Sequence, residues 1–482
     1  MTGVMKLITT GAAPAYGKTW KTINWPRVHV DVERLQKRIA KATAEEKWGK
    51  VRALQWLLTH SLCAKLLAVK RVTSNKGAKT AGIDNVTWLT PARKLEGALS
   101  LKRRGYKAQP LRRIEIPKRD GKKRKLGIPT IYDRAMQALY KLALEPVAET
   151  LADGNSYGFR PRRACRDAIA HCFNIFAKKG SAKWVLEADI KACFDEIDFD
   201  WLLENIPVDR VMLNQWLKCG FMIGRKMFPT KAGTPQGGII SPLLANLTLD
   251  GLQKVIEEAV PWRSKVYFVR YADDFIVSAK NKEILEEKVL PAIKAFLAER
   301  GLRLSETKTK ITHIDDGFDF LSQNVRKYNG KLLIKPTKDA MNSVSEKVRT
   351  ILFKSRGISA DILIQRLNPV IRGWTNYHRH IVASKVFSRL DYILYNSLWQ
   401  WLKKRHSEKS RGWIKRTYFS LSERNWFAVP SKKDKTKIVE LLKFGDSHIK
   451  YHIKIKSDAN PFNPKYDEYF NAKRKNKQHT FA

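Results

Sequence analysis

Periodic runs of hydrophobic residues divide the chain into a helical start, a strand-rich middle and a helical end. Between residues 32 and 72, hydrophobic side chains recur at steps of three and four, which predicts amphipathic helices. Residues 111–118 and 125–129 alternate like paired strands, and Asp120-Gly121 between them is typical of a hairpin turn. Residues 1–30 lack clear periodicity and are predicted to form a flexible lead. After residue 336 the pattern becomes helical, basic and rich in tryptophan.

Two strand-like runs in the middle of the chain end in acidic residues. Residues 266–277 place β-rich arms on both sides of Ala272, Asp273 and Asp274, which predicts a hairpin with two adjacent carboxylates at its tip. Asp189 ends the other run. Acids beside buried strands are costly unless they are neutralised, and a divalent cation does this well. For an isolated Asp-Asp pair, a solvated turn is the alternative.

Three carboxylates in this arrangement predict a site for two Mg²⁺ ions. Such a pair of ions, about 4 Å apart, drives in-line attack on a phosphoryl group. The predicted ligands and catalytic residues are Asp189, Asp273 and Asp274, and their oxygen atoms suit hard Mg²⁺. Asp195, Asp198 and Asp200 lie near Asp189 in the sequence and compete for this role, although Asp198 or Asp200 also suits a helix cap before Trp201.

The order of these blocks resembles a known family. Asp189, the Gly-rich stretch around Pro235-Gln236-Gly237 and the Tyr271-Ala272-Asp273-Asp274 block follow one another as in the palm of reverse transcriptases encoded by group II introns. Residues 156–163, 317–322 and 367–380 resemble further blocks of that family. The likeness implies an α+β right-hand polymerase, with fingers, a palm built on an antiparallel sheet, an α-helical thumb and a small basic C-terminal domain.

The resemblance also implies domain boundaries. Residues 1–90 would be an N-terminal extension with a loop that covers the template. Residues 91–335 would be the fingers and palm, and residues 336–410 the thumb or maturase domain. Residues 411–482 would be a basic DNA-binding domain, whose tail beyond Lys473 is predicted to be disordered without a partner.

Five residues would contact the incoming nucleotide by this resemblance. They are Lys118, Arg124, Phe194, Gln236 and Lys308. Cations on the finger hairpin would neutralise the triphosphate, and an arginine can grip two oxygens at once. Lys125 stands where the family often has proline, so which basic residue touches the phosphates stays open. Ser322 replaces the usual glycine of a turn that would grip the primer.

Phe194 would select deoxynucleotides. In the family an aromatic residue at this position lies beneath the sugar, where a 2′-hydroxyl would clash with the ring. Close packing cannot absorb the extra oxygen. The alternative is an ordinary core phenylalanine after a strand.

Basic residues outside the palm are candidates for contact with RNA or DNA. The set comprises Lys76, Lys79, Arg160, Arg372, Arg379, His380, Lys403, Lys404, Arg405, Lys415 and Arg416. Basic residues among aromatic ones suit a surface that follows a nucleic-acid backbone. Trp374, Tyr377 and Ile381 share a helical face and are favoured as core, and for the loop at Lys76 and Lys79 an ordinary surface loop is an equal alternative.

Composition supports a polyanionic partner. The 482 residues include 92 Lys and Arg against 46 Asp and Glu, a formal net charge of +46. We find no long uncharged hydrophobic span and no signal peptide, so no membrane partner is expected. Five scattered cysteines without a C-x-x-C pair fit reduced thiols in the cytoplasm. There we expect the protein to be associated with the nucleoid as a ribonucleoprotein. No zinc site is expected, and no endonuclease module of the kind found in many relatives.

The sequence therefore predicts an RNA-directed DNA polymerase that adds dNTPs to a DNA primer on an RNA template. The family likeness implies that it copies intron RNA during retrohoming into a DNA target site, and that as a maturase it binds group II intron RNA and assists splicing. A domesticated polymerase with a repair or defence role, and a maturase without polymerase activity, are the alternatives. The sequence leaves open whether the protein is a monomer or a homodimer.

Overall fold

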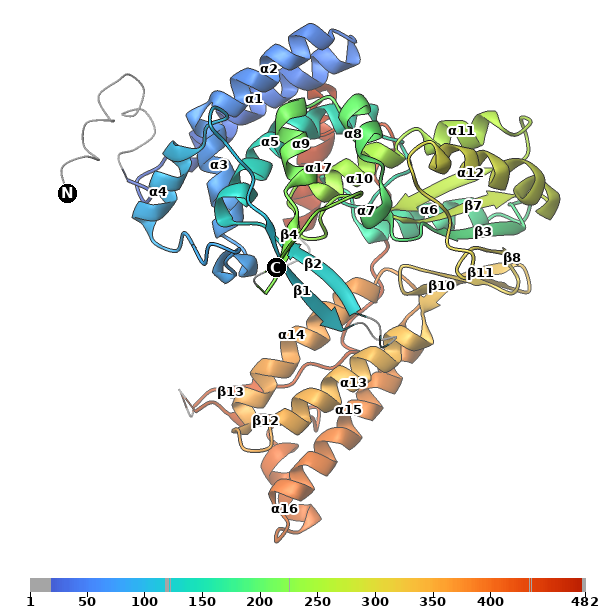
Figure 1. Cartoon of the computed structure of the whole chain (residues 1–482). Helices are drawn as coiled ribbons and strands as arrows, with labels where there is room; N and C mark the ends of the chain where they lie inside the picture. Colours follow the sequence, from blue (N-terminus) through green and yellow to red (C-terminus); the bar gives the residue numbers. More distant parts are fainter. Residues whose placement is uncertain are drawn as a thin grey trace.

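The structure is a computed structural model that describes residues 19–117, 121, 123–224, 226–432, 434 and 436–478. It contains runs of helices and runs of strands, as the predicted α+β right-hand architecture requires. Figure 1 shows a broad upper body that carries most of the strands and a lower lobe of long helices that also holds β12 (Ala428–Pro430) and β13 (Ile438–Glu440). The upper body holds the predicted fingers and palm, and the lower lobe holds the predicted thumb.

The N-terminal helices pack on one long central helix. They are α1 (Trp25–Ala44), α2 (Trp48–His60), α3 (Leu62–Thr73), the 3₁₀ turn η3 (Lys76–Lys79) and α4 (Pro91–Ser100). Their shared support is α5 (Ile131–Leu151), which Thr130 caps at its N-terminus. The predicted lead is wrong over its last residues, because Asn24 caps α1 and Val28 is fully buried.

The fingers carry a four-stranded sheet in the order β2-β1-β4-β5. The predicted hairpin is confirmed as β1 (Leu111–Pro117) paired antiparallel with β2 (Lys123–Ile128). The short strands β4 (Phe221–Ile223) and β5 (Lys226–Phe228) extend the sheet from β1.

The palm sheet has the order β6-β7-β3-β8 with every neighbouring pair antiparallel. Its strands are β6 (Tyr267–Tyr271), β7 (Asp274–Ala279), β3 (Trp184–Asp189) and β8 (Lys310–His313). The helices of the palm and of its junction with the fingers are α6 (Cys165–Phe176), α7 (Cys193–Glu196), α8 (Phe199–Asn205), α9 (Arg210–Lys218), α10 (Ser241–Leu249), α11 (Leu252–Glu258), the π-helix η4 (Ile284–Val289) and α12 (Leu290–Ala298). Asp198 caps α8, as predicted.

A small sheet leads from the palm into the thumb. Its strands are β9 (Phe318–Phe320), β10 (Gln323–Tyr328) and β11 (Lys331–Pro336). The thumb helices α13 (Lys338–Lys354), α14 (Ala360–His378), α15 (Ser384–Arg405) and α16 (Arg411–Tyr418) follow, with the two-stranded sheet of β12 (Ala428–Pro430) and β13 (Ile438–Glu440). Leu363, Leu394 and Phe427 belong to the core that all these thumb elements share.

In the described part of the C-terminal segment, residues 411–482, the buried side chains join cores with the thumb and the palm, whereas a separate domain was predicted. The first part of this segment, up to Phe444, packs into the thumb core. The chain then returns to the palm, where Ile455 and Tyr466 join a second core with Tyr157. The turn η5 (Pro464–Tyr466) and helix α17 (Asp467–Gln478) follow, and red α17 lies in the upper body in Figure 1. A helix therefore extends beyond Lys473, where disorder was predicted.

Two further features concern the whole chain. None of the five cysteines forms a disulfide, in agreement with the predicted thiols. Among the described helices, none has the length and hydrophobicity needed to cross a membrane.

Candidate active site

The two adjacent acids lie at the tip of the predicted hairpin. Strand β6 ends at Tyr271 and β7 begins at Asp274, so Ala272 and Asp273 form the turn. Ala272 has a φ of 60°, which is a costly conformation for a residue other than glycine. Gly158 packs against this turn so closely that a β-carbon there would lie 2.3 Å from the Ala272 nitrogen. The surrounding backbone therefore imposes the conformation of the turn.

Strand register brings the third acid to the same place. Strand β3 pairs with β7 so that Asp189 lies opposite Asp274. Both strands are anchored by buried hydrophobic side chains, including Leu186 and Val277. A shift of one residue would turn these side chains to the wrong face, so the packing fixes the register. Asp189, Asp273 and Asp274 thus meet at one end of the palm sheet.

Negative charge is incompletely compensated at this end of the sheet. Desolvation, followed by repulsion from Asp273 and interaction with Asp189, raises the pKa of Asp274 to about 7, although this side chain still reaches solvent. Desolvation also raises the pKa of Asp273, and repulsion from Asp189 adds to the effect. The Lys308 ammonium lies 2.8 Å from Asp189 Oδ2 and supplies one positive charge. Further cationic charge would stabilise the ionised cluster.

The donor set suits a hard divalent cation. All three side chains offer carboxylate oxygens, which Mg²⁺ prefers. Within the part of the chain that the structure describes, no three His, Cys, Asp or Glu side chains are already gathered into a metal-binding group. Ionised carboxylates repel one another, and here Lys308 pairs with Asp189 instead. The chemistry of the three residues fits a metal site, and the ions would have to draw the carboxylates together.

Phe194 lies beside the carboxylates on the short helix α7. Ala192 precedes this helix with a φ of 44°, and Phe194 is half-buried against the main core. The exposed ring of Phe159 meets it edge-on, with the ring centroids 6.3 Å apart. Tyr157 is buried and its hydroxyl forms a hydrogen bond with His171, whereas Phe159 is exposed beside Phe194.

The finger hairpin reaches the palm through Arg124 and Gln236. Arg124 Nε donates to Gln236 Oε1 over 2.8 Å. Gln236 Nε2 donates in turn to Asp195 Oδ2 over 2.9 Å. Asp195 was considered only as a competing metal ligand, and its link to Gln236 could not be seen from sequence spacing. Lys118 lies outside the described residues.

A small cavity of about 170 Å³ opens beside the carboxylates. Asp189, Asp274 and Lys308 line one side, and Asp319 and Leu321 line the other. Leu321 and Ser322 have φ values of 50° and 62°, so the turn keeps a left-handed backbone without the family's usual glycine. The Tyr377 hydroxyl donates to the Leu321 carbonyl over 3.0 Å and ties the thumb to this turn. Tyr377 is therefore an exposed connecting residue, whereas it was favoured as core.

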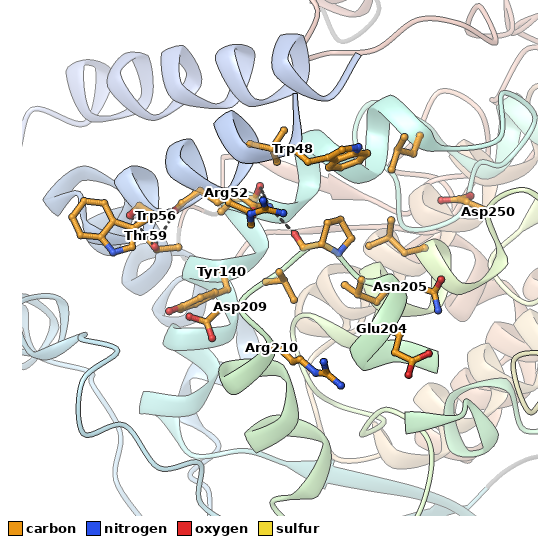
Figure 2. A pocket seen from close by; sticks show the side chains of 18 of the residues that line it. Trp48, Arg52, Trp56, Thr59, Tyr140, Glu204, Asn205, Asp209, Arg210 and Asp250 are labelled. Atoms are coloured by element: carbon orange, nitrogen blue, oxygen red, sulfur yellow. Dashed lines mark hydrogen bonds between the residues drawn. The ribbon is translucent and has the colours of Figure 1, made fainter. Parts of the chain in front are cut away.

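A much larger cavity lies away from these acids. It has a volume of about 920 Å³ and opens between α2 and the segment that joins α8 to α9 (Figure 2). Trp48, Trp56 and Tyr140 line it together with three arginines and three acids. Arg103 and Asp209 pair with each other across its rim. Its opposite charges balance, and it contains no cluster of carboxylates such as phosphoryl transfer requires.

Known families match three parts of the chain. The family described as "Reverse transcriptase (RNA-dependent DNA polymerase)" matches residues 116–325, which include the three carboxylates. The "N-terminal domain of reverse transcriptase" matches residues 20–101, and "Group II intron, maturase-specific domain" matches residues 341–419. Group II intron-encoded protein LtrA of Lactococcus lactis subsp. cremoris is 29% identical over 448 residues, which covers 73% of this chain and 74% of LtrA. Protein YkfC of Escherichia coli strain K12 is 29% identical over 381 residues, which covers 69% of this chain and 99% of YkfC.

The chain belongs to the family of group II intron-encoded reverse transcriptases with a maturase domain. It is an RNA-directed DNA polymerase, a class of enzyme that generally uses divalent metal ions, and its domains imply RNA and other nucleic acid as partners. Among solved structures, telomerase from Candida albicans in complex with a fragment of telomeric RNA gives a TM-score of 0.37 at 12% identity and covers 64% of each chain. A TM-score of this size supports no conclusion about the reverse transcriptase.

Most basic residues predicted to bind nucleic acid are exposed in this reverse transcriptase. Lys76 and Lys79 lie on η3, Arg372 on α14, and Arg379 is half-exposed at the end of α14. Lys403, Lys404 and Arg405 end α15, and Lys415 and Arg416 lie on α16. Arg405 also donates to the carbonyls of Arg356 and Ile358, so part of its guanidinium holds the loop between α13 and α14.

Two predicted nucleic-acid contacts are corrected by the structure of the reverse transcriptase. Arg160 is buried in the palm, where its guanidinium pairs with both oxygens of Glu149 and donates to the Asp153 and Ser156 carbonyls. These partners use the donors that a phosphate would need. Desolvation, with the positive charges nearby, lowers the pKa of His380 to about 4, so at neutral pH it offers no cation to a phosphate. Charge patterns in a sequence do not distinguish such buried residues from exposed ones.

Proposed function

We propose that this reverse transcriptase copies RNA into DNA at Asp189, Asp273 and Asp274, with two bound Mg²⁺ ions. The observation that supports this most directly is the register of β3 and β7, which sets Asp189 opposite Asp274 beside the turn that holds Asp273. The substrates would be dNTPs, a DNA primer and an RNA template. Two Mg²⁺ ions bound there would lower the pKa of the primer 3′-hydroxyl and stabilise the triphosphate and the leaving pyrophosphate.

The chain's own residues would orient the reactants around this centre. Arg124 projects from the finger hairpin and would bind phosphate oxygens, where negative charge grows during the reaction. Phe194 would fill the space that a 2′-hydroxyl requires. Lys308, which neutralises Asp189, would turn to the triphosphate or to the primer end once metal replaces it. Lys118 is proposed for the phosphates on the family resemblance alone.

The proposed division of labour among the domains follows the family. The N-terminal extension would cover the template, and the fingers and palm would catalyse. The thumb would hold the duplex, and the C-terminal residues would contact the DNA target site. Part of the C-terminal segment is buried against the thumb and the palm, so only the remaining exposed parts of residues 411–478 would be available to DNA.

We also propose a maturase activity, in which the protein binds group II intron RNA and stabilises its folded form. The match to a maturase-specific domain over residues 341–419 favours it. The exposed basic side chains at the end of α15 and on α16 would contact RNA phosphates. Reverse transcription of the intron RNA at a DNA target would then support retrohoming.

Two variants separate the activities. We expect Asp273→Asn to lose cDNA synthesis and to retain splicing assistance, because maturase binding does not use the carboxylates. A combined Lys403→Glu, Lys404→Glu variant should lose splicing assistance and retain extension of a short primer. Both are measured on the intron RNA that flanks the reading frame, and folding is checked by circular dichroism. Equal loss of both activities in either folded variant would contradict the separation.

A further inference from the structure

A chain of polar contacts runs from the finger hairpin to the palm helix α7. Arg124 Nε donates to Gln236 Oε1 over 2.8 Å, and Gln236 Nε2 donates to Asp195 Oδ2 over 2.9 Å. Arg124 and Asp195 reach solvent, and Gln236 lies half-buried between them. Polar contacts of this exposure contribute little to folding stability. Their effect is on the direction in which Arg124 points.

The backbone holds the middle residue of this chain of contacts in place. Gln236 accepts a hydrogen bond from the Gly127 nitrogen of β2 over 2.8 Å, and the Thr234 nitrogen donates to the Phe194 carbonyl over 2.6 Å. Gly237 has a φ of 125°, and a β-carbon there would lie 2.4 Å from the Gly127 carbonyl oxygen. The loop is therefore clamped between β2 and α7. Only the side chain of Gln236 is left to adjust.

Asp195 determines which end of the Gln236 amide faces Arg124. A carboxylate accepts hydrogen bonds and cannot donate them, so it requires the NH₂ end of the amide. The carbonyl end then faces Arg124, which can only donate. Without Asp195 the amide is free to rotate and to present its NH₂ group to the guanidinium, where no hydrogen bond forms.

The remaining donors of Arg124 are available for a ligand. Among the residues that the structure describes, only its Nε has a hydrogen-bond partner. With Nε held, the two Nη groups are directed as a fork that suits two phosphate oxygens. A flexible arginine loses rotamer entropy when it binds, and holding it beforehand reduces that loss.

We propose that Asp195 is a positioning residue for the incoming nucleotide: through Gln236 it orients Arg124 toward the triphosphate. This inference rests on the proposed function. It assigns to Asp195 a role in nucleotide affinity that is separate from the metal site and from the sugar selection by its neighbour Phe194.

The test is single-nucleotide extension by the full chain on an RNA template, with the dNTP concentration varied. We expect Asp195→Ala to raise the KM for dNTP about threefold to tenfold, as for one lost hydrogen bond of ordinary strength, while kcat changes less than about twofold. Asp195→Asn keeps an acceptor for the Gln236 amide and should restore a KM close to that of the wild type. Glu196→Ala is the matched control, since Glu196 neighbours Asp195 and its side chain pairs with Arg303 instead.

A double-variant comparison separates positioning from a general effect on folding. In an Arg124→Lys background the Nε donor is gone, so adding Asp195→Ala should raise the KM little further. The preference for dNTPs over ribonucleotides should stay unchanged, because Phe194 keeps its place. An unchanged KM in Asp195→Ala, the same rise in both backgrounds, or a lost sugar preference would each overturn the proposal. A folded wild type that extends no primer would refute the proposed function itself, and with it the ligand assigned to Arg124.

Discussion

At the scale of single residues, Phe194 shows how packing can become selectivity. Its ring is held between the main hydrophobic core and the edge of Phe159. The backbone of α7 is also fixed, since Gly233 lies against the Phe194 carbonyl. A rigid ring can exclude one oxygen atom, whereas a mobile one would move aside.

Replacing this ring should relax sugar selection. We expect Phe194→Ala to raise the incorporation of ribonucleotides relative to deoxynucleotides by about 10- to 100-fold, because overpacking by one oxygen costs about 1–3 kcal/mol. The measurement is primer extension with each nucleotide alone. Phe159→Ala removes only the edge that supports this ring and should relax the preference less than Phe194→Ala. An unchanged preference in a folded Phe194→Ala variant would remove the proposed gate.

The sequence alone could identify site residues that a local pattern marks, such as an acid at the end of a hydrophobic run. Asp189, Asp273 and Asp274 end hydrophobic runs, and the register later brought them together. The contacts of Asp195 with Gln236 and of Phe159 with Phe194 could not be predicted, because these partners lie 41 and 35 positions away in the chain. Arg160 was misassigned since its partner Glu149 lies in the neighbouring helix, where no charge pattern reveals the pair.

At the scale of elements, the C-terminal segment joins three parts of the molecule. His452 Nε2 lies 2.7 Å from Asp167 Oδ1 on α6, and Lys37 on α1 lies 2.8 Å from Asp467 on α17. Arg163 donates to the Ser457 and Ala459 carbonyls. The segment therefore ties the thumb, the palm and the N-terminal helices together.

Asp167 should be the main anchor of this segment. Burial favours its neutral form, but the hydrogen bond and charge of His452, with the Ile455 N–H group, lower the pKa of Asp167 below its ordinary value. Because the folded pKa is depressed, this stabilisation is present above about pH 4 and is lost as the pH falls through the lower, folded pKa. We expect Asp167→Asn to weaken the attachment at neutral pH by about 2 kcal/mol, as for a lost hydrogen bond to a charged group.

Hydrogen exchange can measure this effect segment by segment. In Asp167→Asn, amides of residues 452–474 should exchange faster, while those of the thumb helices should not. Asp391→Asn is a matched control, because Asp391 accepts from the Phe444 and Gly445 nitrogens within the thumb. Unchanged exchange over residues 452–474 would show that hydrophobic contacts alone hold the segment.

Most elements were predictable because their periodicity is local. The finger hairpin and the thumb helix α14 lie where hydrophobic spacing placed them. The path of residues 445–466 could not be predicted in the same way. This stretch has almost no regular structure, and only its contacts with distant side chains determine its position.

At the scale of the whole molecule, high positive charge coexists with buried neutral histidines. The net charge of +46 favours a polyanionic partner and makes binding sensitive to salt. Burial lowers the pKa of His171 to about 3 and that of His378 to about 4. Both rings are uncharged in the folded protein at neutral pH.

These histidines predict a loss of stability in mild acid. Below about pH 6.5 these histidines become protonated in the unfolded chain but stay neutral in the folded protein. The free energy of unfolding therefore decreases as the pH falls toward 4. Each ring contributes about 1.4 kcal/mol per pH unit over that range. We expect the melting temperature to fall steadily between pH 7 and pH 5, and His378→Gln to reduce that dependence. Equal melting temperatures across this range would contradict the prediction.

The central claim is that Asp189, Asp273 and Asp274 form the metal site of an RNA-directed DNA polymerase. The most direct measurement is primer extension on an RNA template with Mg²⁺ and dNTPs, in which the wild type is compared with Asp273→Asn. Asp200→Asn is the matched control, since that acid lies in the first turn of α8 and outside the site. We predict full-length cDNA from the wild type and the control, and a rate at least about a thousandfold lower for Asp273→Asn, because the ions supply several kcal/mol of charge stabilisation. Equal extension by wild type and Asp273→Asn, or none by a well-folded wild type, would contradict the assignment.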